Sequence, residues 1–286
     1  MFILLTFLIN INIEAISQSL VDPILESSHT GICIYSLKKD RLVFEHNGAK
    51  LFVPASNQKI LTTAAALHYL GGEFRYITRL KMRGEIQASS LLGDLILVGS
   101  GDPSIKDYSF LERWADIVKN LGVHTIIGSI IVDDRVFSNE RLPEGWAWHY
   151  LDARYGAEIS GFSFNGNVVK VTVKPGNKIN DTAQVILDPQ TQYVKIKNNL
   201  ITVESLNGNT ISQEINIYRE PEANIIHLEG AVAKNFKGRT YEIAVKDPAL
   251  FAGYYFKELL ERRGIRVYGY PKRVDTLTAN FGHAER

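Results

Sequence analysis

The sequence predicts a mixed α/β (α+β) fold, in which an α/β domain is interrupted by a large β-rich insert. Residues 56–70 form a continuous helical pattern rich in Ala and Leu, and residues 248–263 form a second one. Between them, short runs of β-branched and aromatic residues alternate with glycines, as in residues 93–98 and 168–173. The two helical patterns therefore bracket an inserted β-rich region, which we assign to residues 75–244.

The chain begins with an apolar segment that is typical of a secretion signal. Its first thirteen residues are almost wholly apolar, which is long enough for the core of a signal peptide and too short to span a bilayer comfortably. The small residues Ala15 and Ser17 suit a signal peptidase and would make Gln18 the first mature residue. We therefore expect residues 1–17 to be a signal peptide and the protein to be exported, to the periplasm or the cell envelope. The alternatives are a buried first strand or a wrongly assigned start codon.

Residues 18–74 are predicted to form a β-hairpin followed by a helix. The β-rich runs 32–35 and 42–44 are separated by a charged turn, a pattern that favours an antiparallel pair. Pro54 then precedes the first helical pattern, which a pair of glycines ends. Ser56 consequently stands at a helix N-terminus.

The insert and the C-terminal segment are assigned from the same kinds of pattern. Within the insert, residues 109–121 form a helix-like stretch, and after the second long helix residues 265–268 have the pattern of a further strand. We expect residues 245–286 to join residues 18–74 in one discontinuous domain, because the two long helices bracket the insert.

Composition indicates a globular protein and argues against several partners. A hydrophobic fraction of 45% is enough for a sizeable core. Thirty-two basic residues balance thirty-one acidic ones, so the net charge of +1 gives no field that would attract nucleic acid. The seven histidines show no metal-ligand spacing, and we assign no metal and no cofactor. The single cysteine, Cys33, lies in an apolar run and is expected to be a small buried core residue.

The motif that carries chemistry is Ser56-x-x-Lys59 at the start of the first helix. Residues three apart at a helix start project from the same face, so the two side chains can touch. The positive end of the helix dipole and a partly desolvated site both favour a neutral amine. Lys59 can then act as the general base that takes the proton of the Ser56 hydroxyl as it attacks a carbonyl.

A non-catalytic interpretation of these residues is an N-cap serine followed by a solvated lysine. Serine is common at the N-cap position. The lysine argues against this interpretation, because a capping box places Glu or Gln at the third helical position and the dipole disfavours a cation there by roughly 0.3 to 1 kcal/mol. Ser-x-x-Lys alone is a weak signal, and the preceding hairpin, Pro54 and the Ala-rich helix give it weight.

Seven segments, taken together, form a specific pattern. They are FVPASNQK at residues 52–59, LGDLILVGSGDP at 92–103, IGSIIVDD at 127–134, GWAW at 145–148, NVVKVTVKPG at 167–176, DPAL at 247–250 and RGI at 263–265. Through these segments nearly the whole chain resembles the penicillin-binding protein 4-type D-alanyl-D-alanine carboxypeptidases and endopeptidases, which form peptidase family S13.

The resemblance implies both a fold and an activity. The fold is a serine transpeptidase/β-lactamase-like α/β domain with a β-rich insert after the Ser-x-x-Lys helix. The activity is that of a serine-type D-Ala-D-Ala carboxypeptidase or endopeptidase, which acts on peptidoglycan stem peptides through an acyl-enzyme. Ser56 is then the nucleophile, Lys59 is the base, and β-lactams are inhibitors.

Two further family motifs fall outside the match. Members carry Ser-x-Asn and Lys-Thr-Gly on the C-terminal side of the Arg-Gly-Ile segment, and this sequence ends at Arg286 before either of them. We therefore expect a transpeptidase-like domain that is C-terminally incomplete. Three local look-alikes begin at Ser163, Lys174 and Ser205, and we interpret them as strand and turn residues of the insert.

Three functional hypotheses remain. The first is the acyl-transfer enzyme described above. The second is a truncated, catalytically inactive cell-wall-binding fragment, which the missing motifs and the intact insert suggest. The third is a relative of class C β-lactamases or esterases, which share Ser-x-x-Lys but which the insert disfavours. Labelling by a fluorescent penicillin that depends on Ser56 separates the first hypothesis from the second.

Overall fold

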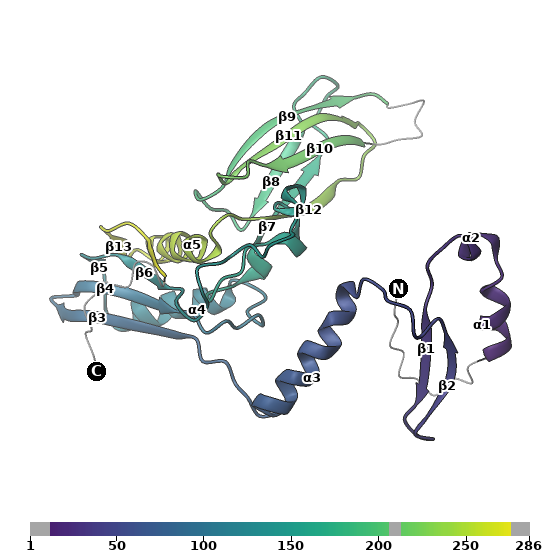
Figure 1. The fold of residues 1–286 in the computed structure, drawn as a ribbon. Helices are drawn as coiled ribbons and strands as arrows, with labels where there is room; N and C mark the ends of the chain where they lie inside the picture. Colours follow the sequence, from purple (N-terminus) through teal and green to yellow (C-terminus); the bar gives the residue numbers. More distant parts are fainter. Residues whose placement is uncertain (1–11, 206–212, 276–286) are drawn as a thin grey trace. The chain divides into compact units, whose positions relative to one another are not determined.

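The computed structural model describes residues 12–205 and 213–275 and divides the chain into two compact units, residues 1–75 and 76–286 (Figure 1). The predicted signal peptide lies mostly outside the described residues, which begin at Asn12. None of the helices in the described ranges is long and apolar enough to cross a membrane.

From Asn12 onward, where its description begins, the first unit contains a β-hairpin and three α-helices. The predicted hairpin is confirmed, because its two strands pair antiparallel from Ile32↔His46 to Ser36↔Arg41. In chain order the elements are α1 (Ile13–Ser19), α2 (Pro23–Glu26), β1 (Ile32–Ser36), β2 (Arg41–His46) and α3 (Gln58–Leu70).

Cys33 on β1 is exposed, so the expectation of a buried core residue was wrong. Among the described residues β1 pairs only with β2, in a two-stranded sheet. Side chains alternate between the two faces of a strand, and Tyr35, on the same face as Cys33, is 51% exposed. The apolar run thus forms a strand with one uncovered face.

Helix α3 ends where the sequence predicts. Gly71 takes a φ of 76°, a left-handed conformation that glycine adopts without a Cβ clash, and its N–H donates to the Leu67 carbonyl. None of the α3 side chains is buried, and more than half of Leu61 and of Leu67 is exposed. The helix therefore forms with little packing of its apolar side chains.

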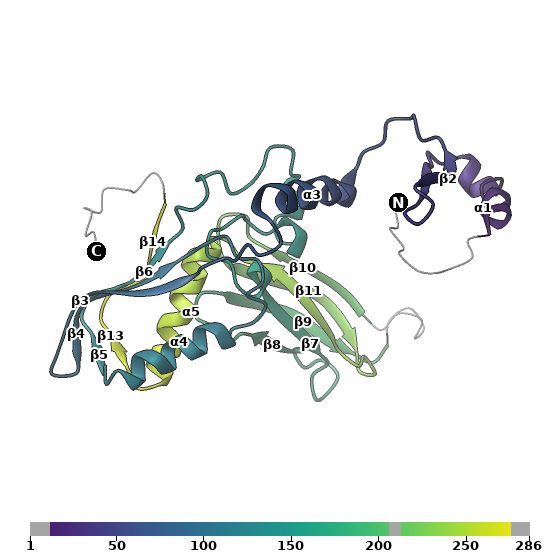
Figure 2. The ribbon, with the colours of Figure 1, turned by 90° about the horizontal axis from the view of Figure 1, so that it is seen from below.

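The second unit is organised around a mixed six-stranded sheet (Figure 2). Strand β3 pairs antiparallel with β4 on one side. On the other side β5 and β6 pair parallel with the start and the end of β4, and β13 and β14 pair parallel with β5 and β6 in turn. The strands are β3 (Arg79–Gln87), β4 (Ser90–Val98), β5 (Thr125–Ile126), β6 (Ile130–Asp133), β13 (Arg266–Val267) and β14 (Lys272–Val274).

Two helices pack on this sheet. Helices α4 (Ser109–Asn120) and α5 (Pro248–Arg262) confirm both helix predictions to within one residue. They contact each other, and α5 lies on β6, β13 and β14. The sheet residues Leu95, Leu97 and Val132 are buried. Burial of apolar side chains between helices and sheet is the main favourable contribution to such a layer.

The remaining described strands of the second unit form two three-stranded sheets. One has the order β12-β7-β8 and the other β10-β11-β9, in which β11 and β9 run parallel. These strands are β7 (Val168–Lys174), β8 (Gln184–Asp188), β9 (Lys195–Val203), β10 (Gln213–Arg219), β11 (Ile225–Ala233) and β12 (Arg239–Ala244). Short 3-10 turns span Ala55–Asn57 in the first unit and Trp148–Tyr150, Arg154–Gly156 and Asn165–Asn167 in the second.

The described part of the C-terminal segment, residues 245–275, belongs to the second unit. There α5 packs on strands of the region that the sequence assigns to the insert. The grouping of residues 245–286 with residues 18–74 in one domain stays a prediction, and residues 276–286 lie outside the described ranges.

A network of ion pairs fixes the start of α5. Asp247 has a φ of 53° and caps the helix by accepting a 3.0 Å hydrogen bond from the Leu250 N–H. Its carboxylate also lies 3.3 Å from the Arg141 guanidinium and 3.4 Å from that of Arg273 on β14. Arg141 in turn pairs with Glu158 at 2.9 Å. These contacts join segments that are distant in the sequence.

Candidate active site

Ser56 lies in a 3-10 turn directly before α3. The Asn57 N–H donates to the Pro54 carbonyl at 2.9 Å and closes the turn. The sequence predicts a helix from Ser56, whereas the α-helix begins at Gln58. The turn takes the place of the first helical residues, so the serine still stands at the N-terminal end of α3.

Lys59 and Ser56 are in direct contact. Lys59 Nζ donates a hydrogen bond of 2.9 Å to Ser56 Oγ. Both residues are exposed and belong to neighbouring turns of one helical segment, so local backbone geometry brings them together. The distance is within the range expected between a general base and its nucleophile. The structure thus brings together the two residues that the sequence singles out.

The interpretation of Ser56 as an N-cap finds no support in these contacts. Asn57 occupies the cap position of α3, and no side chain makes a capping hydrogen bond there. Ser56 Oγ is instead the acceptor for Lys59. No side chain caps the positive end of the helix beside the Ser56 hydroxyl. This positive end would stabilise an alkoxide that develops there.

Ala55 takes a positive φ of 44°, in the left-handed region that residues other than glycine rarely adopt. Backbone strain of this kind costs on the order of 1–3 kcal/mol and occurs preferentially at functional sites. Sequence reasoning missed the feature because alanine carries no signal for a left-handed conformation. The strain falls directly before Ser56, where a turn that presents a nucleophile would carry it.

A hollow of about 510 Å³ lies beside this turn, within the first unit. Its lining comes from the hairpin and from the segment that leads into the turn, and it reaches Pro54 and Asn57 on either side of Ser56. His29 and Phe52 stack in its wall with ring centroids 4.3 Å apart. The hollow therefore offers both apolar and polar surface next to Ser56.

Other residues of the family-like segments are held by folding contacts of the second unit. The Asp134 carboxylate is buried and accepts hydrogen bonds from Ser160 Oγ at 2.8 Å and from the Gly161 N–H at 2.6 Å. Burial raises the pKa of the Asp134 carboxyl. Gly99 lies so close to Gly161 that an added Cβ would stand 2.4 Å from its carbonyl carbon. These residues therefore contribute to the packing of the second unit.

Two of the three look-alike motifs take part in turns and strands, as the sequence predicts. In the motif that begins at Ser163, Asn165 donates from Nδ2 to the Val168 carbonyl at 3.0 Å. Lys174 is the last residue of β7. The third motif begins at Ser205 and continues into residues outside the described ranges.

Histidines of the described ranges make local contacts. Nε2 of His46 lies 2.9 Å from Nδ2 of Asn47, and Nε2 of His227 lies 2.7 Å from a Glu220 carboxylate oxygen. Within the same ranges, no three His, Cys, Asp or Glu side chains lie close enough together to hold a metal ion.

Comparison with known proteins relates nearly the whole chain to one family. The model of the D-Ala-D-Ala carboxypeptidase 3 (S13) family matches residues 12–280. A D-alanyl-D-alanine carboxypeptidase of an Actinomadura species is 31% identical over 268 residues, or 90% of this chain and 48% of that protein. D-alanyl-D-alanine carboxypeptidase DacB of Haemophilus influenzae is 23% identical over 260 residues, or 91% and 52%. The chain spans about half the length of the curated relatives it matches.

Solved structures share the fold. The crystal structure of penicillin binding protein 4 (dacB) from Haemophilus influenzae matches with a TM-score of 0.74 at 22% identity, over 92% of this chain and 56% of that one. A structure of the same protein complexed with a novel β-lactam matches with a TM-score of 0.67 at 20% identity, over 93% and 55%. The likeness confirms the predicted mixed α/β fold class.

Proposed function

The chain belongs to the S13 family of D-Ala-D-Ala carboxypeptidases, and on that premise we propose that it acts as a serine-type D-Ala-D-Ala carboxypeptidase or endopeptidase on peptidoglycan stem peptides. The observation that carries the proposal is the 2.9 Å contact between Lys59 Nζ and Ser56 Oγ. This contact lies in a segment, residues 52–59, that the family match includes.

In the proposed acylation, Ser56 Oγ attacks the carbonyl carbon of the D-Ala-D-Ala amide. The neutral Lys59 amine takes the hydroxyl proton along the line that joins Oγ and Nζ. As the tetrahedral intermediate collapses, the C–N bond breaks, the proton passes from Lys59 to the leaving nitrogen, and D-alanine departs. The product is an ester between the stem peptide and Ser56.

Water completes the proposed cycle by attacking the ester carbonyl carbon, and Lys59 again accepts the proton. The bond between that carbon and Ser56 Oγ then breaks, the proton passes from Lys59 to Oγ, and the shortened stem peptide leaves as a carboxylic acid. The uncapped N-terminal end of α3 stabilises the negative charge that develops near Ser56 in both steps. A β-lactam presents a similar amide carbonyl, and opening of its ring leaves it attached to the serine. We therefore expect β-lactams to be covalent inhibitors.

The substrate also bears on where the protein acts. Stem peptides of peptidoglycan are part of the cell wall, so we propose that the protein is exported to the periplasm or cell envelope. The apolar first thirteen residues support export, with residues 1–17 as the proposed signal peptide.

Covalent labelling with a fluorescent penicillin tests the proposal. The labelled chain is followed on a denaturing gel and by intact mass, and the modified peptide is mapped. We expect a single adduct on Ser56 in the wild type and none in Ser56→Ala. Ser163→Ala, which removes a look-alike serine of the insert, is the matched control and should label like the wild type. Labelling that survives in Ser56→Ala would refute the assignment of the nucleophile.

A second arm of the experiment separates the enzyme from a non-catalytic fragment. It adds the part of a relative that carries the family's Ser-x-Asn and Lys-Thr-Gly motifs. Labelling of Ser56 that rises with this addition supports catalysis by an assembled site. If Ser56 stays unlabelled in both arms, the chain is better described as a cell-wall-binding fragment, and binding to isolated peptidoglycan sacculi is the assay for that role.

A further inference from the structure

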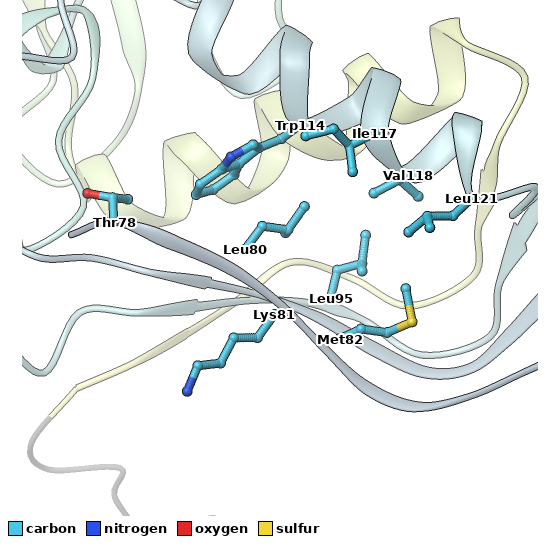
Figure 3. A pocket seen from close by; sticks show the side chains of 9 residues that line it. All are labelled: Thr78, Leu80, Lys81, Met82, Leu95, Trp114, Ile117, Val118 and Leu121. Carbon is cyan, nitrogen blue, oxygen red and sulfur yellow. The ribbon is translucent and has the colours of Figure 1, made fainter. Parts of the chain in front are cut away.

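Two cavities of the second unit differ in their chemistry. The cavity between β3 and α4, of about 270 Å³, is lined mainly by apolar side chains, and its one charged lining residue, Lys81, points away from it (Figure 3). A second cavity, of about 690 Å³, is lined by β8, by the last turns of α5 and by residues 190–192. Strand β8 contributes Val185, Ile186 and Leu187, and α5 contributes Glu258, Glu261 and Arg262. This second cavity combines apolar surface with charged groups, as ligand sites commonly do.

Glu258 is a partly satisfied carboxylate in the wall of the second cavity. Its Oε1 accepts hydrogen bonds from the Gln192 N–H at 2.7 Å and from Thr191 Oγ1 at 3.1 Å. Its Oε2 is buried and has no hydrogen-bond partner among the described residues. A buried carboxylate oxygen without a donor is costly in free energy. Glu258 therefore offers an acceptor to a donor from outside the chain.

Arg262 brings the opposite charge to the same wall. It is exposed and follows Glu258 by four residues on α5, a spacing at which opposite charges on a helix often pair. Here they do not, because the Glu258 carboxylate is turned towards residues 191–192 and the Arg262 Cζ atom lies 5.3 Å from the centroid of the Tyr255 ring. Within the part of the chain that the structure describes, Arg262 makes no ion pair. Its guanidinium is therefore available to an anion.

Glu261, the third charged residue of the lining, already has a partner. Its Oε1 lies 3.7 Å from Lys257 Nζ, one turn earlier on α5. Lys257 is itself held in place, because its Nζ also donates to the Gly269 carbonyl at 3.1 Å. The lining charges that remain without an ion pair are thus one carboxylate, on Glu258, and one guanidinium, on Arg262. A ligand that complements both carries one cationic and one anionic group close together.

We propose that this cavity binds a free aliphatic α-amino acid. The ammonium group donates to the Glu258 carboxylate and the carboxylate accepts from Arg262, because an α-amino acid carries both groups on one carbon, a spacing that suits two side chains one helical turn apart. The aliphatic side chain packs against the apolar side chains of β8. Because Oε2 is buried, binding includes a turn of the carboxylate about its terminal bond, which is a soft torsion. All of these residues lie in the second unit, so the proposal is independent of the chemistry assigned to Ser56.

Isothermal titration calorimetry with leucine tests the proposal on the 286-residue chain. We expect saturable binding of L-leucine or D-leucine at a single site, with a dissociation constant of about 1 mM or lower. Leucinamide lacks the carboxylate and N-acetylleucine lacks the ammonium group, so each should bind at least about tenfold more weakly. The two compounds also represent leucine at the start and at the end of a peptide. Their weaker binding would distinguish a free amino acid from a peptide terminus.

Two variants with matched controls test the two charges. Glu258→Gln and Arg262→Gln should each weaken leucine binding about tenfold or more, because each removes one charge of the lining. Glu261→Gln is the control for the first, since it changes a carboxylate of the same lining that is already paired. Arg266→Gln is the control for the second, since it changes another exposed arginine that lies over a tyrosine ring. Both controls should bind leucine like the wild type, and circular dichroism melts should show that all four variants fold.

Three outcomes would overturn the proposal. The first is no saturable binding of either enantiomer of leucine up to about 20 mM, in which case solvent alone satisfies Glu258 and Arg262. The second is binding of leucinamide or N-acetylleucine as tight as that of leucine, because the site would then recognise only one of the two charges. The third is equal weakening of leucine binding in the test variants and in their controls.

Discussion

Arg273 on β14 holds its guanidinium Nε 3.4 Å from a carboxylate oxygen of Asp247, and so ties the last described strand to the residue that begins α5. The Arg273 and Asp247 side chains are only 15% and 16% exposed. Each of the two guanidinium groups near Asp247 also has a closer carboxylate partner: Arg141 pairs with Glu158 at 2.9 Å, and Arg273 pairs with Asp275 at 2.6 Å. One carboxylate thus caps a helix and also joins a network of ion pairs.

Asp247→Ala should destabilise the second unit by about 1–2 kcal/mol, mainly because it removes the helix cap, since Arg141 and Arg273 keep their other carboxylate partners. Asp247→Asn should cost less, because asparagine can still cap the helix and tolerates a positive φ. Urea unfolding at neutral pH measures the loss in the free energy of unfolding for both variants. Asp116→Ala is the control, because its ion pair with Arg263 is on the surface and the Asp116 side chain is 56% exposed. A loss in Asp247→Ala no larger than that of the control would contradict this account.

Lys59→Ala should slow the acylation of Ser56 by penicillin by about 100-fold or more, which is the usual loss when a general base is removed. Lys38→Ala changes an exposed lysine at the hairpin turn and should leave the rate unchanged. Stopped-flow or gel-based labelling measures the rates, and far-ultraviolet circular dichroism checks the fold. If Lys59→Ala is acylated at a near wild-type rate, the base is another group.

Ala55→Gly should stabilise the turn before α3 by up to about 1 kcal/mol, because glycine adopts a positive φ without strain. Ala65→Gly, in the middle of α3, should have the opposite effect by about the same amount. Thermal melts compare the two variants. Destabilisation by Ala55→Gly would mean that the alanine side chain contributes more than its backbone strain costs.

The Glu258→Gln substitution should stabilise the protein relative to the wild type, and this stabilisation should grow as the pH rises. Glu258 Oε1 accepts hydrogen bonds from Thr191 Oγ1 and the Gln192 N–H, while Oε2 is buried with no hydrogen-bond partner among the described residues. Burial raises the pKa of this carboxyl above its usual 4.5. The folded state then holds the proton to a higher pH than the unfolded state does, so the glutamate destabilises the fold progressively above about pH 4.5.

The measurement is the difference in Tm between Glu258→Gln and the wild type. It should be larger at pH 7 than at pH 4, because the variant carries no charge at either pH while the wild-type carboxyl ionises between them. Glu261→Gln, one turn along α5 and 47% exposed, should show no such trend. If the difference in Tm between Glu258→Gln and the wild type does not change with pH, the account is wrong. The Glu258 carboxyl then either stays protonated up to pH 7 or is exposed to water at both pH values.

The elements that sequence reasoning predicted well are those that local pattern determines. The hairpin, α4 and α5 each carry a clear periodicity with a turn or glycine at the end, and their bounds follow it. The contact of Ser56 with Lys59 was predictable for the same reason, because three residues of helical backbone place the two side chains together.

Features that depend on distant contacts were not predictable. Nothing in the sequence of β9 and β11 indicates that they pair in parallel, and Cys33 carries no sign that its strand face stays uncovered. The Asp247 network joins residues more than a hundred positions apart. The positive φ of Ala55 is likewise set by its surroundings, because alanine has no preference for that conformation.

Helix α3, with Ser56 and Lys59 at its start, has thirteen residues and no buried side chain. A helix of that length is marginal in water unless other groups cover it. Its amide protons should therefore exchange with deuterium far faster than those of α5, which buries nine residues. Any ligand or polypeptide that covers α3 would slow that exchange along the whole helix. The proposed reactivity of Ser56 would in this way depend on the folding equilibrium of the helix that presents it.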